Sequence, residues 1–226
     1  GSSATAGQLR PTKIQSNVTQ ILRKVVTVSD TANTTANYGR GRELMYQLEK
    51  AWAWEHQALV RARAICGDSQ VMASFDKIRQ TVLQLPRAVD AVRIDVSTMR
   101  HKMQDHLGSD KHTQQQGLFH LKQDAGGMVD IEFMAQFAVL AYANDYPELA
   151  VWSDNVRIFE MLAKTGIVPN DVCIKLTEAY LRIRAATHRL ALAEQPIVVP
   201  DADWQALRSF VDDTWQHLIG QRPQQF

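Results

Sequence analysis

Cysteine is scarce in this sequence of 226 residues, which contains only Cys66 and Cys173. Two cysteines so far apart form neither a disulfide framework nor the paired spacing of a zinc site, and this usage fits a reducing cytoplasm. Long apolar runs are also missing, since none approaches the roughly 18 residues that a membrane span requires. We therefore expect a cytoplasmic protein with no membrane contact.

Clusters of one charge are missing as well. The formal net charge is +1, and no predicted face gathers the positive charge that nucleic-acid binding needs, so we expect no nucleic-acid partner. Four histidines, His101, His106, His112 and His120, fit neither a helical i, i+4 pair nor a zinc pattern. We interpret them as residues of a solvent-facing surface and predict no metal site.

Composition and periodicity together indicate the class of fold. Hydrophobic residues make up 45% of the chain and charged residues 22%, which is typical of a globular protein that can bury a large core. The spacing of apolar residues predicts an all-α helical bundle of about six or seven helices, with one short extended segment near 118–122. Residues 1–40 are interpreted as a tag remnant and a poorly defined N-terminal segment, and residues 41–226 as the helical bundle domain.

The individual helices are predicted from apolar stripes, capping residues and glycine or proline stops. Between them, 109–117 is predicted to be a polar loop, and Pro196 to Pro200 a hinge-like connection. The predicted helices cover 43–65, 68–85, 88–107, the stretch after Gly127 to about 144, 153–163, 170–194 and 201–219.

One stretch, 119–136, combines several local patterns. Phe119 and Leu121 alternate with polar neighbours, as in a short extended segment. The diglycine Gly126-Gly127 then permits a turn that a Cβ would block, and apolar residues at helical spacing follow it directly. The stretch therefore delivers polar side chains beside a tight turn that opens onto the start of a helix.

That arrangement suits an anion. Free backbone N–H groups at a helix start, the ammonium of Lys122 and glycines that let a ligand touch the main chain are components of a phosphate or carboxylate site. Asp130 and Glu132 in the first turn compete for the same positive helix end. A plain tight turn followed by helix-stabilising acids is the alternative interpretation, and spacing alone leaves it open.

The helix after the diglycine is apolar nearly all round, so we expect it to be buried in the middle of the bundle. Asp130 and Glu132 then lie on an element that cannot easily move, and Gln136 is one turn beyond Glu132 on the same face. A buried acid needs a partner. The candidates are Lys122, Arg157 or a main-chain amide.

Three stretches resemble one family, the bacterial glutamine synthetase adenylyltransferases. Residues 122–133 read KQDAGGMVDIEF and resemble the family's K-x-x-x-G-G-x-x-D-I-E-F segment. Residues 52–63, WAWEHQALVRAR, resemble its W-x-W-E-H-Q-A-L-x-R-A-R segment, and residues 152–157, WSDNVR, resemble its W-[ST]-D-N-V-R segment. The three motifs follow the family's order and spread over most of residues 43–195.

The resemblance implies the helical part of the adenylylating half of a bifunctional enzyme, which transfers AMP from ATP to a tyrosine of glutamine synthetase with Mg²⁺. The family's catalytic strand motif, a Gly-Ser followed by paired metal-binding aspartates, is absent from these residues. Because phosphoryl-type transfer depends on metal ions, we expect no catalytic residue in this fragment and no activity from it alone. The implied partners are glutamine synthetase, a PII-type signal protein and the missing nucleotidyltransferase domain.

Two groups of candidate site residues follow. The first would form a nucleotide-binding wall of the active site: Lys122, Gly126, Gly127, Asp130 and Glu132. The second group comes from the two flanking motifs and contains Trp54, Glu55, His56, Arg61, Arg63, Asp154, Asn155 and Arg157. Of these, Arg61 and Arg63 lie too close in sequence to share a helix face.

A non-catalytic role is the alternative hypothesis. In that case the chain would be a regulatory or docking module that binds glutamine synthetase, a PII-type signal protein or glutamine. Arg182, Arg184, His188 and Arg189 make part of one predicted helix basic. That pattern is typical of a solvated face, and a docking surface for an acidic partner is its second interpretation.

Overall fold

A computed structural model describes residue 51 and residues 53–220. These residues belong to two compact units, one that includes residues 51 and 64–78 and the other residues 53–63 and 79–220. The domain boundary predicted at residue 40 lies outside the described residues. Most of the first half of the helix predicted over 43–65 lies outside them too.

The described part of the first unit contains the beginning of helix α4, Ser69–Leu83. The carboxylate of Asp68 accepts hydrogen bonds from the N–H groups of Gln70 and Val71, which would otherwise have no partner in the first helical turn. Asp68 therefore caps α4, as its type and position predict.

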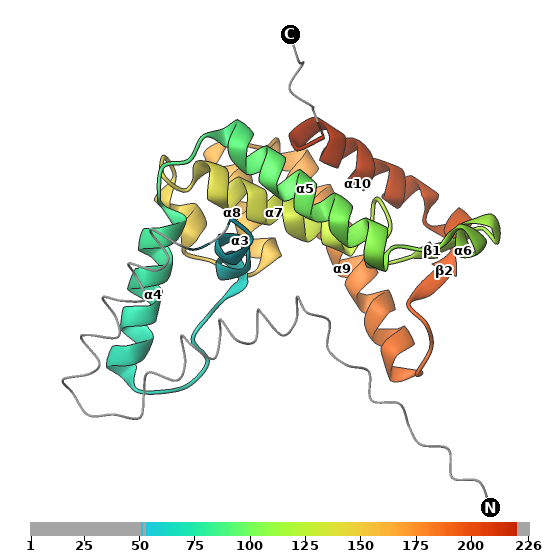
Figure 1. Ribbon diagram of the computed structural model, residues 1–226, viewed down its shortest axis with the longest axis horizontal. Coiled ribbons are helices and arrows are strands. Elements are labelled where there is room, and N and C mark those ends of the chain that lie inside the picture. The colour runs from blue at the N-terminus through green and yellow to red at the C-terminus, as the bar shows by residue number, and fades with distance from the viewer. Residues whose placement is uncertain (1–50, 52, 221–226) are drawn as a thin grey trace, which may run out of the picture. The chain divides into compact units, whose positions relative to one another are not determined.

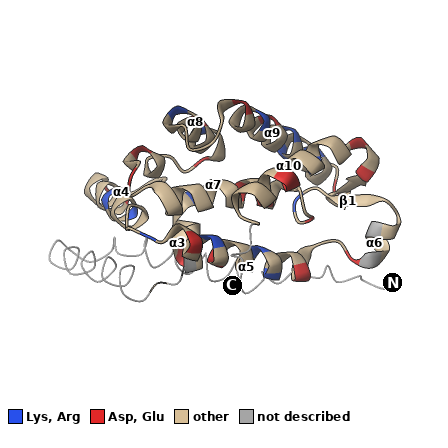
Figure 2. Ribbon diagram, turned by 90° about the horizontal axis from the view of Figure 1, so that it is seen from above, with Lys and Arg blue, Asp and Glu red and all other residues tan. Residues whose placement is uncertain are grey.

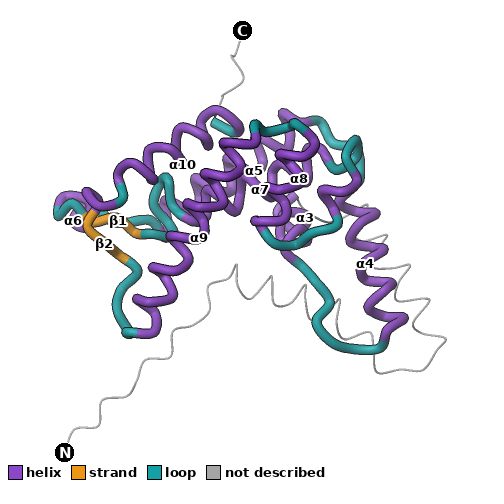
Figure 3. Tube along the Cα trace, turned by 180° about the vertical axis from the view of Figure 1, so that it is seen from behind, coloured by secondary structure: helices purple, strands orange, loops and turns teal. Residues whose placement is uncertain are grey.

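The second unit contains the other described elements, whose course can be followed in Figures 1 and 3. Short 3₁₀ turns and two three-residue strands connect its helices. In chain order they are α3 (Ala53–Arg61), α5 (Val89–Leu107), α6 (Lys111–Gln115), β1 (Leu118–His120), α7 (Met128–Tyr142), η2 (Pro147–Ala150), α8 (Asn155–Thr165), α9 (Asn170–Leu192), β2 (Val198–Pro200), η3 (Asp201–Asp203) and α10 (Gln205–Leu218).

Helix α7 forms the centre of this unit. It packs against α3, α5, α8, α9 and α10, and in Figure 2 its ribbon is almost free of charged residues. Thirteen of its 15 residues are buried, because a helix that is apolar all round finds no stable place on a surface. The predicted all-α bundle and its buried central helix are confirmed, and no helix among the described residues is long and apolar enough to cross a membrane.

The extended segment predicted near 118–122 is confirmed as strand β1, and its pairing with a second strand was not predicted. Residues 198–200, predicted as part of a hinge-like connection, form β2 and pair antiparallel with β1, Phe119 opposite Val199. Pro200 is tolerated because it stands at the end of the strand, where its missing N–H removes no internal ladder bond. The pairing ties the start of the central stretch to the segment that leads into α10.

The loop predicted over 109–117 contains one helical turn, α6. Asp110 supplies its cap, because its carboxylate accepts a hydrogen bond of 2.8 Å from the N–H of Thr113. The same hydrogen bond lowers the pKa of Asp110. A polar composition rich in glutamine concealed this turn, whose stability comes from its cap rather than from an apolar stripe.

Helix α3 ends at Arg61, four residues before the predicted end at 65. The cause is the buried guanidinium of Arg79, which donates hydrogen bonds to the carbonyls of Leu59 and Val60. In a longer helix those carbonyls would accept from the N–H groups of residues 63 and 64. Arg79 also donates to the carbonyls of Ala150 and Trp152, so it joins the end of α3 to the segment around η2.

Candidate functional site

Asp124 organises the turn between β1 and α7. Its carboxylate accepts hydrogen bonds from the N–H of His120 at 2.8 Å, and from the N–H and the hydroxyl of Ser109 at 2.7 and 2.8 Å. His120 Nδ1 in turn accepts from the N–H groups of Lys122 and Gln123. The prediction that His120 faces solvent is therefore wrong, because the half-buried ring serves as an acceptor for the turn.

The two glycines of the turn make room for the chain itself. Gly126 has a φ of +78°, and a Cβ there would lie 2.4 Å from the backbone oxygen of Arg208 in α10. A Cβ on Gly127 would lie 2.8 Å from the backbone oxygen of Asp124. The close approaches that were expected for a ligand are thus occupied by backbone of the same molecule.

The N–H groups at the start of α7 are likewise occupied. A backbone anion site needs them free, yet each of the five from 126 to 130 donates to an oxygen of the chain. Gly126 donates to the carboxylate of Asp130 at 2.6 Å, Gly127 to Asp124 O at 3.0 Å, Met128 to Leu121 O at 2.9 Å, Val129 to Lys122 O at 3.2 Å and Asp130 to Gly127 O at 3.2 Å. Any anion bound here must therefore be held by side chains.

Asp130 is a structural residue. Its carboxylate forms an ion pair with Arg100 of α5, and the two side chains are only 4% and 2% exposed. Of the three expected partners the main-chain amide is present, as Gly126 N–H, whereas Lys122 and Arg157 are replaced by Arg100. Burial raises the pKa of Asp130, and the guanidinium and the amide oppose that rise.

Glu132, two residues further along α7, has a different environment. It is half-buried, and the positive charges of Arg61 in α3, Lys122 in the turn and Arg184 in α9 act on it. Burial raises the pKa of Glu132, and the three cations lower it in part. We call these four residues the cationic cluster; three positive charges and one negative charge leave it a formal charge of +2.

Two hydrogen bonds join α3, which carries Arg61, to neighbouring helices of the bundle. Arg61 Nη1 donates to Asn155 Oδ1 of α8 at 2.7 Å. One turn earlier in α3, Gln57 Nε2 donates to Gln136 Oε1 of α7 at 2.7 Å, and both amides are buried. Side chains from the three sequence motifs, at 52–63, 122–133 and 152–157, are thereby brought together around one side of α7.

The remaining predicted residues are distributed around this site. Arg63 is exposed while Arg61 enters the cluster, as their spacing predicts. Arg157 is exposed and pairs with Glu160 at 2.7 Å, and Asp154 caps α8 by accepting from the N–H of Arg157. Glu55 is buried, and Trp54 and His56 line a pocket on α3.

Sequence reasoning missed Arg100 and considered Arg184 only as part of a basic helix face. A signal for Arg100 exists, since it follows Val92 and Val96 at four-residue intervals and therefore lies on the apolar face of α5. A charge on such a face requires a buried partner. Arg184 carries no comparable signal, because an exposed arginine on a long helix is commonplace.

A metal site is not formed by the described residues: no group of three or more His, Cys, Asp or Glu side chains among them could hold a metal ion. The positively charged groups of the cluster suit phosphate oxygens instead.

Family models match three parts of the chain. Residues 43–78 match glutamate-ammonia ligase adenylyltransferase, and residues 97–196 match GlnD PII-uridylyltransferase. Residues 1–56 match the SU10 major capsid protein, a match that falls almost wholly outside the described residues.

Curated relatives agree with the two transferase matches. The chain is 52% identical to a bifunctional glutamine synthetase adenylyltransferase/adenylyl-removing enzyme of Acinetobacter baylyi over 174 residues. Those residues make up 77% of this chain. Enzymes of the same name from Pseudomonas aeruginosa and Mannheimia haemolytica are 45% and 43% identical over 76% and 77% of the chain. The chain spans only 18 to 19% of the length of these relatives.

Replacing Gly126 by alanine tests the close packing of the turn. We expect Gly126→Ala to lower the free energy of unfolding by about 2 kcal/mol or more, because left-handed strain and overlap with Arg208 add together. Gly166→Ala is the matched control, since Gly166 has a φ of +73° but open space around its Cβ position, and strain alone costs about 1 kcal/mol. Urea unfolding of both variants measures the difference; equal losses would contradict the packing.

Replacing Glu132 by glutamine tests the electrostatics of the cluster. A carboxyl whose folded pKa is raised contributes stability below its unfolded pKa and loses it as pH rises through the folded value. Glu132→Gln should therefore unfold at higher urea concentration than the wild type at pH 7, with the difference vanishing below about pH 4, near the unfolded value. Glu178→Gln on the exposed side of α9 is the control, and a glutamine variant less stable at pH 7 would refute the assignment.

Proposed function

Because the chain belongs to the family of bifunctional glutamine synthetase adenylyltransferase/adenylyl-removing enzymes, we propose that it is the helical domain of the adenylylating half. In this role it takes part in transferring AMP from ATP to a tyrosine of glutamine synthetase in nitrogen regulation. The location that goes with this substrate is the cytoplasm, and the free thiols of Cys66 and Cys173 accord with it.

The cationic cluster is the observation that carries the proposal. Arg61, Lys122 and Arg184 come from three separate elements, and the positive charge of each lowers the pKa of Glu132. Three like charges repel one another, and a countercharge or a bound anion lessens that repulsion. Glu132 offsets one charge, and a polyphosphate would offset the remaining two.

The cluster would therefore form one wall of the nucleotide site. Lys122 would donate to a phosphate oxygen of ATP, and Arg61, held by Asn155, would present its guanidinium in a fixed orientation. Glu132 would orient the cations while offsetting only one of their three charges. Gly126, Gly127 and Asp130 support the cluster from behind by fixing the turn that carries Lys122.

The nucleotidyltransferase domain of the parent enzyme would hold Mg²⁺ and the catalytic carboxylates. The described residues form no group that could bind a metal ion, and metal ions neutralise the charge that develops during phosphoryl-type transfer. The isolated chain should accordingly be inactive. Its contribution would be to position the phosphates of ATP and to balance their charge from the wall of the active site that faces the nucleotidyltransferase domain.

A docking role is the second candidate, and it rests on α9. Arg182, Arg184, His188 and Arg189 are exposed, and blue segments run along this helix in Figure 2. An acidic surface of glutamine synthetase or of a PII-type signal protein would complement these charges. In that case the cluster would be a structural feature rather than part of the nucleotide site.

Lys122→Ala in the full-length parent enzyme distinguishes the two roles. The nucleotide-wall role predicts a drop in turnover of about tenfold to a hundredfold, the effect of losing one charged hydrogen bond to phosphate. The thermal unfolding temperature should stay unchanged because the backbone bonds of residue 122 remain. The measurement is adenylylation of glutamine synthetase at saturating ATP.

Lys164→Ala, an exposed lysine at the end of α8, is the matched control and should retain full turnover. Unchanged turnover in Lys122→Ala together with an altered response to the signal protein would reject the nucleotide wall and support docking.

A further inference from the structure

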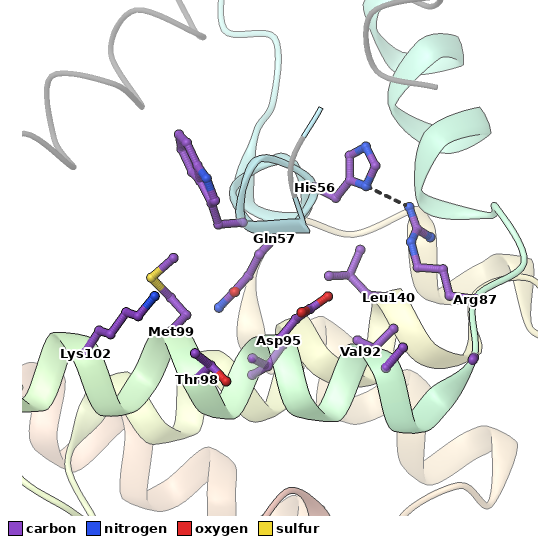
Figure 4. A pocket seen from close by; sticks show the side chains of 13 residues that line it. His56, Gln57, Arg87, Val92, Asp95, Thr98, Met99, Lys102 and Leu140 are labelled. Atoms are coloured by element: carbon purple, nitrogen blue, oxygen red, sulfur yellow. Dashed lines mark hydrogen bonds between the residues drawn. The ribbon is translucent and has the colours of Figure 1, made fainter. Parts of the chain in front are cut away.

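A pocket of about 450 Å³ lies between α3 and α5, away from the cationic cluster. Figure 4 shows Asp95, Thr98 and Lys102 rising from α5 along one side of it. All three are exposed, so these polar groups do not select one class of ligand. The outer face of α9 is more selective, because apolar and charged side chains are arranged along it in a regular order.

Helix α9 carries a line of apolar residues on its outer face. Ile174, Leu181 and Leu192 are 50%, 47% and 88% exposed. They follow one another at intervals of seven and eleven residues, which correspond to about two and three helical turns and so return to the same side of the helix. The exposed Ala185 lies on the same line. We call these four residues the α9 stripe.

The α9 stripe does not belong to the core of the bundle. The buried residues of α9, such as Leu176 and Ile183, lie on the opposite side, where the helix packs against α7, α8 and α10. In Figures 1 and 3 the last turns of α9, which carry Leu192, extend away from α5 and α7. Single exposed leucines are common in proteins, whereas apolar side chains gathered on one face indicate an interaction site.

Positive charges border the α9 stripe. Lys175, Arg182 and Arg189 recur every seven residues and form a line beside it, and Arg184 lies along its other edge. The guanidinium of Arg182 lies over the ring of Trp204, 4.7 Å from its centroid, which holds this cation in place. From 174 to 192 the chain contains four basic residues and one acid. The face around the stripe therefore carries a formal charge of +3.

Charge decides among the candidate occupants of the stripe. A second copy of α9 would bring basic residues against basic residues in a parallel or an antiparallel arrangement, because every charged residue that flanks the stripe is basic. Residues 1–40 contain five basic residues and one acid, so that segment does not complement the face either. The complementary occupant is apolar along its centre and acidic along its edges.

We propose that the α9 stripe docks an amphipathic helix of a partner protein, one whose own apolar stripe is bordered by aspartate and glutamate. Apolar side chains of the partner would pack between Ile174, Leu181 and Leu192, and its carboxylates would accept hydrogen bonds from Arg182 and Arg189. The stripe extends roughly 27 Å along the helix, which about five turns of a partner helix would match. The proposal rests on the docking role of α9 and is independent of the nucleotide wall.

The test uses a fluorescent peptide about three heptads long, with leucine at positions a and d and glutamate at e and g. The glutamates keep the peptide from pairing with itself. It is titrated into the 226-residue chain and followed by fluorescence anisotropy. We expect saturable binding that Leu181→Gln weakens about tenfold, because a leucine side chain is no longer buried. Arg189→Glu should weaken it about threefold or more, and less at high salt.

Matched variants on other helices are the controls. Ile94→Gln removes an apolar side chain of α5 that is 49% exposed, close to the exposure of Leu181. Lys164→Glu reverses an exposed charge at the end of α8. Both variants should bind the peptide as the wild type does. Lys122→Ala should do so too, so a failure of the nucleotide wall appears in turnover and a failure of this proposal appears in peptide binding.

A second peptide, with serine in place of every leucine, separates the stripe from its charged border and should not bind. Three results would overturn the inference: no saturable binding of the leucine peptide by the folded chain, equal affinity of Leu181→Gln and the wild type, or equal binding of the serine peptide. The last result would show that α9 recognises acidic charge alone. Near-ultraviolet circular dichroism of each variant verifies that the fold is intact.

Discussion

The buried ion pair between Arg100 and Asp130 is the constraint on which the central part of the structure depends. Both side chains are almost completely removed from water, so each charge would be very costly without the other; breaking such a pair costs about 3–5 kcal/mol. Asp130 also accepts from the N–H of Gly126, and Arg100 donates to the carbonyls of Gln123 and Asp124. One pair thus fixes α5, the diglycine turn and the start of α7 together.

This constraint decides which groups near the turn are available to a ligand. The N–H groups of the turn donate to oxygens of the same chain, so the start of α7 has a structural role. The charge available to a ligand therefore comes from side chains beside the turn. Asp130 and Glu132 are two residues apart and so lie on different faces of the helix. One face anchors the fold, and the other presents an acid surrounded by Arg61, Lys122 and Arg184.

Local patterns were sufficient to predict much of the fold. The all-round apolar sequence of α7 predicted its burial. A serine or an aspartate was expected to cap the helices that begin near 68 and 153, and Asp68 and Asp154 are the residues that do so. What could not be predicted depends on partners distant in sequence: Arg79 ending α3, β2 pairing with β1, and Arg100 meeting Asp130. In the candidate site, the local pattern drew attention to Lys122 and Glu132 and the flanking motif to Arg61, but neither could tell that the glycines make room for the chain itself instead of a ligand.

Amide hydrogen exchange of residues 126–130, measured with and without ATP, tests most directly whether the N–H groups at the start of α7 are all hydrogen-bonded within the chain. The structure predicts strong protection of these amides in the free protein, comparable to the rest of α7, with no change when ATP is added. Fast exchange in the free protein that slows on addition of ATP would contradict the account. It would show that the backbone of the diglycine turn itself receives the phosphate.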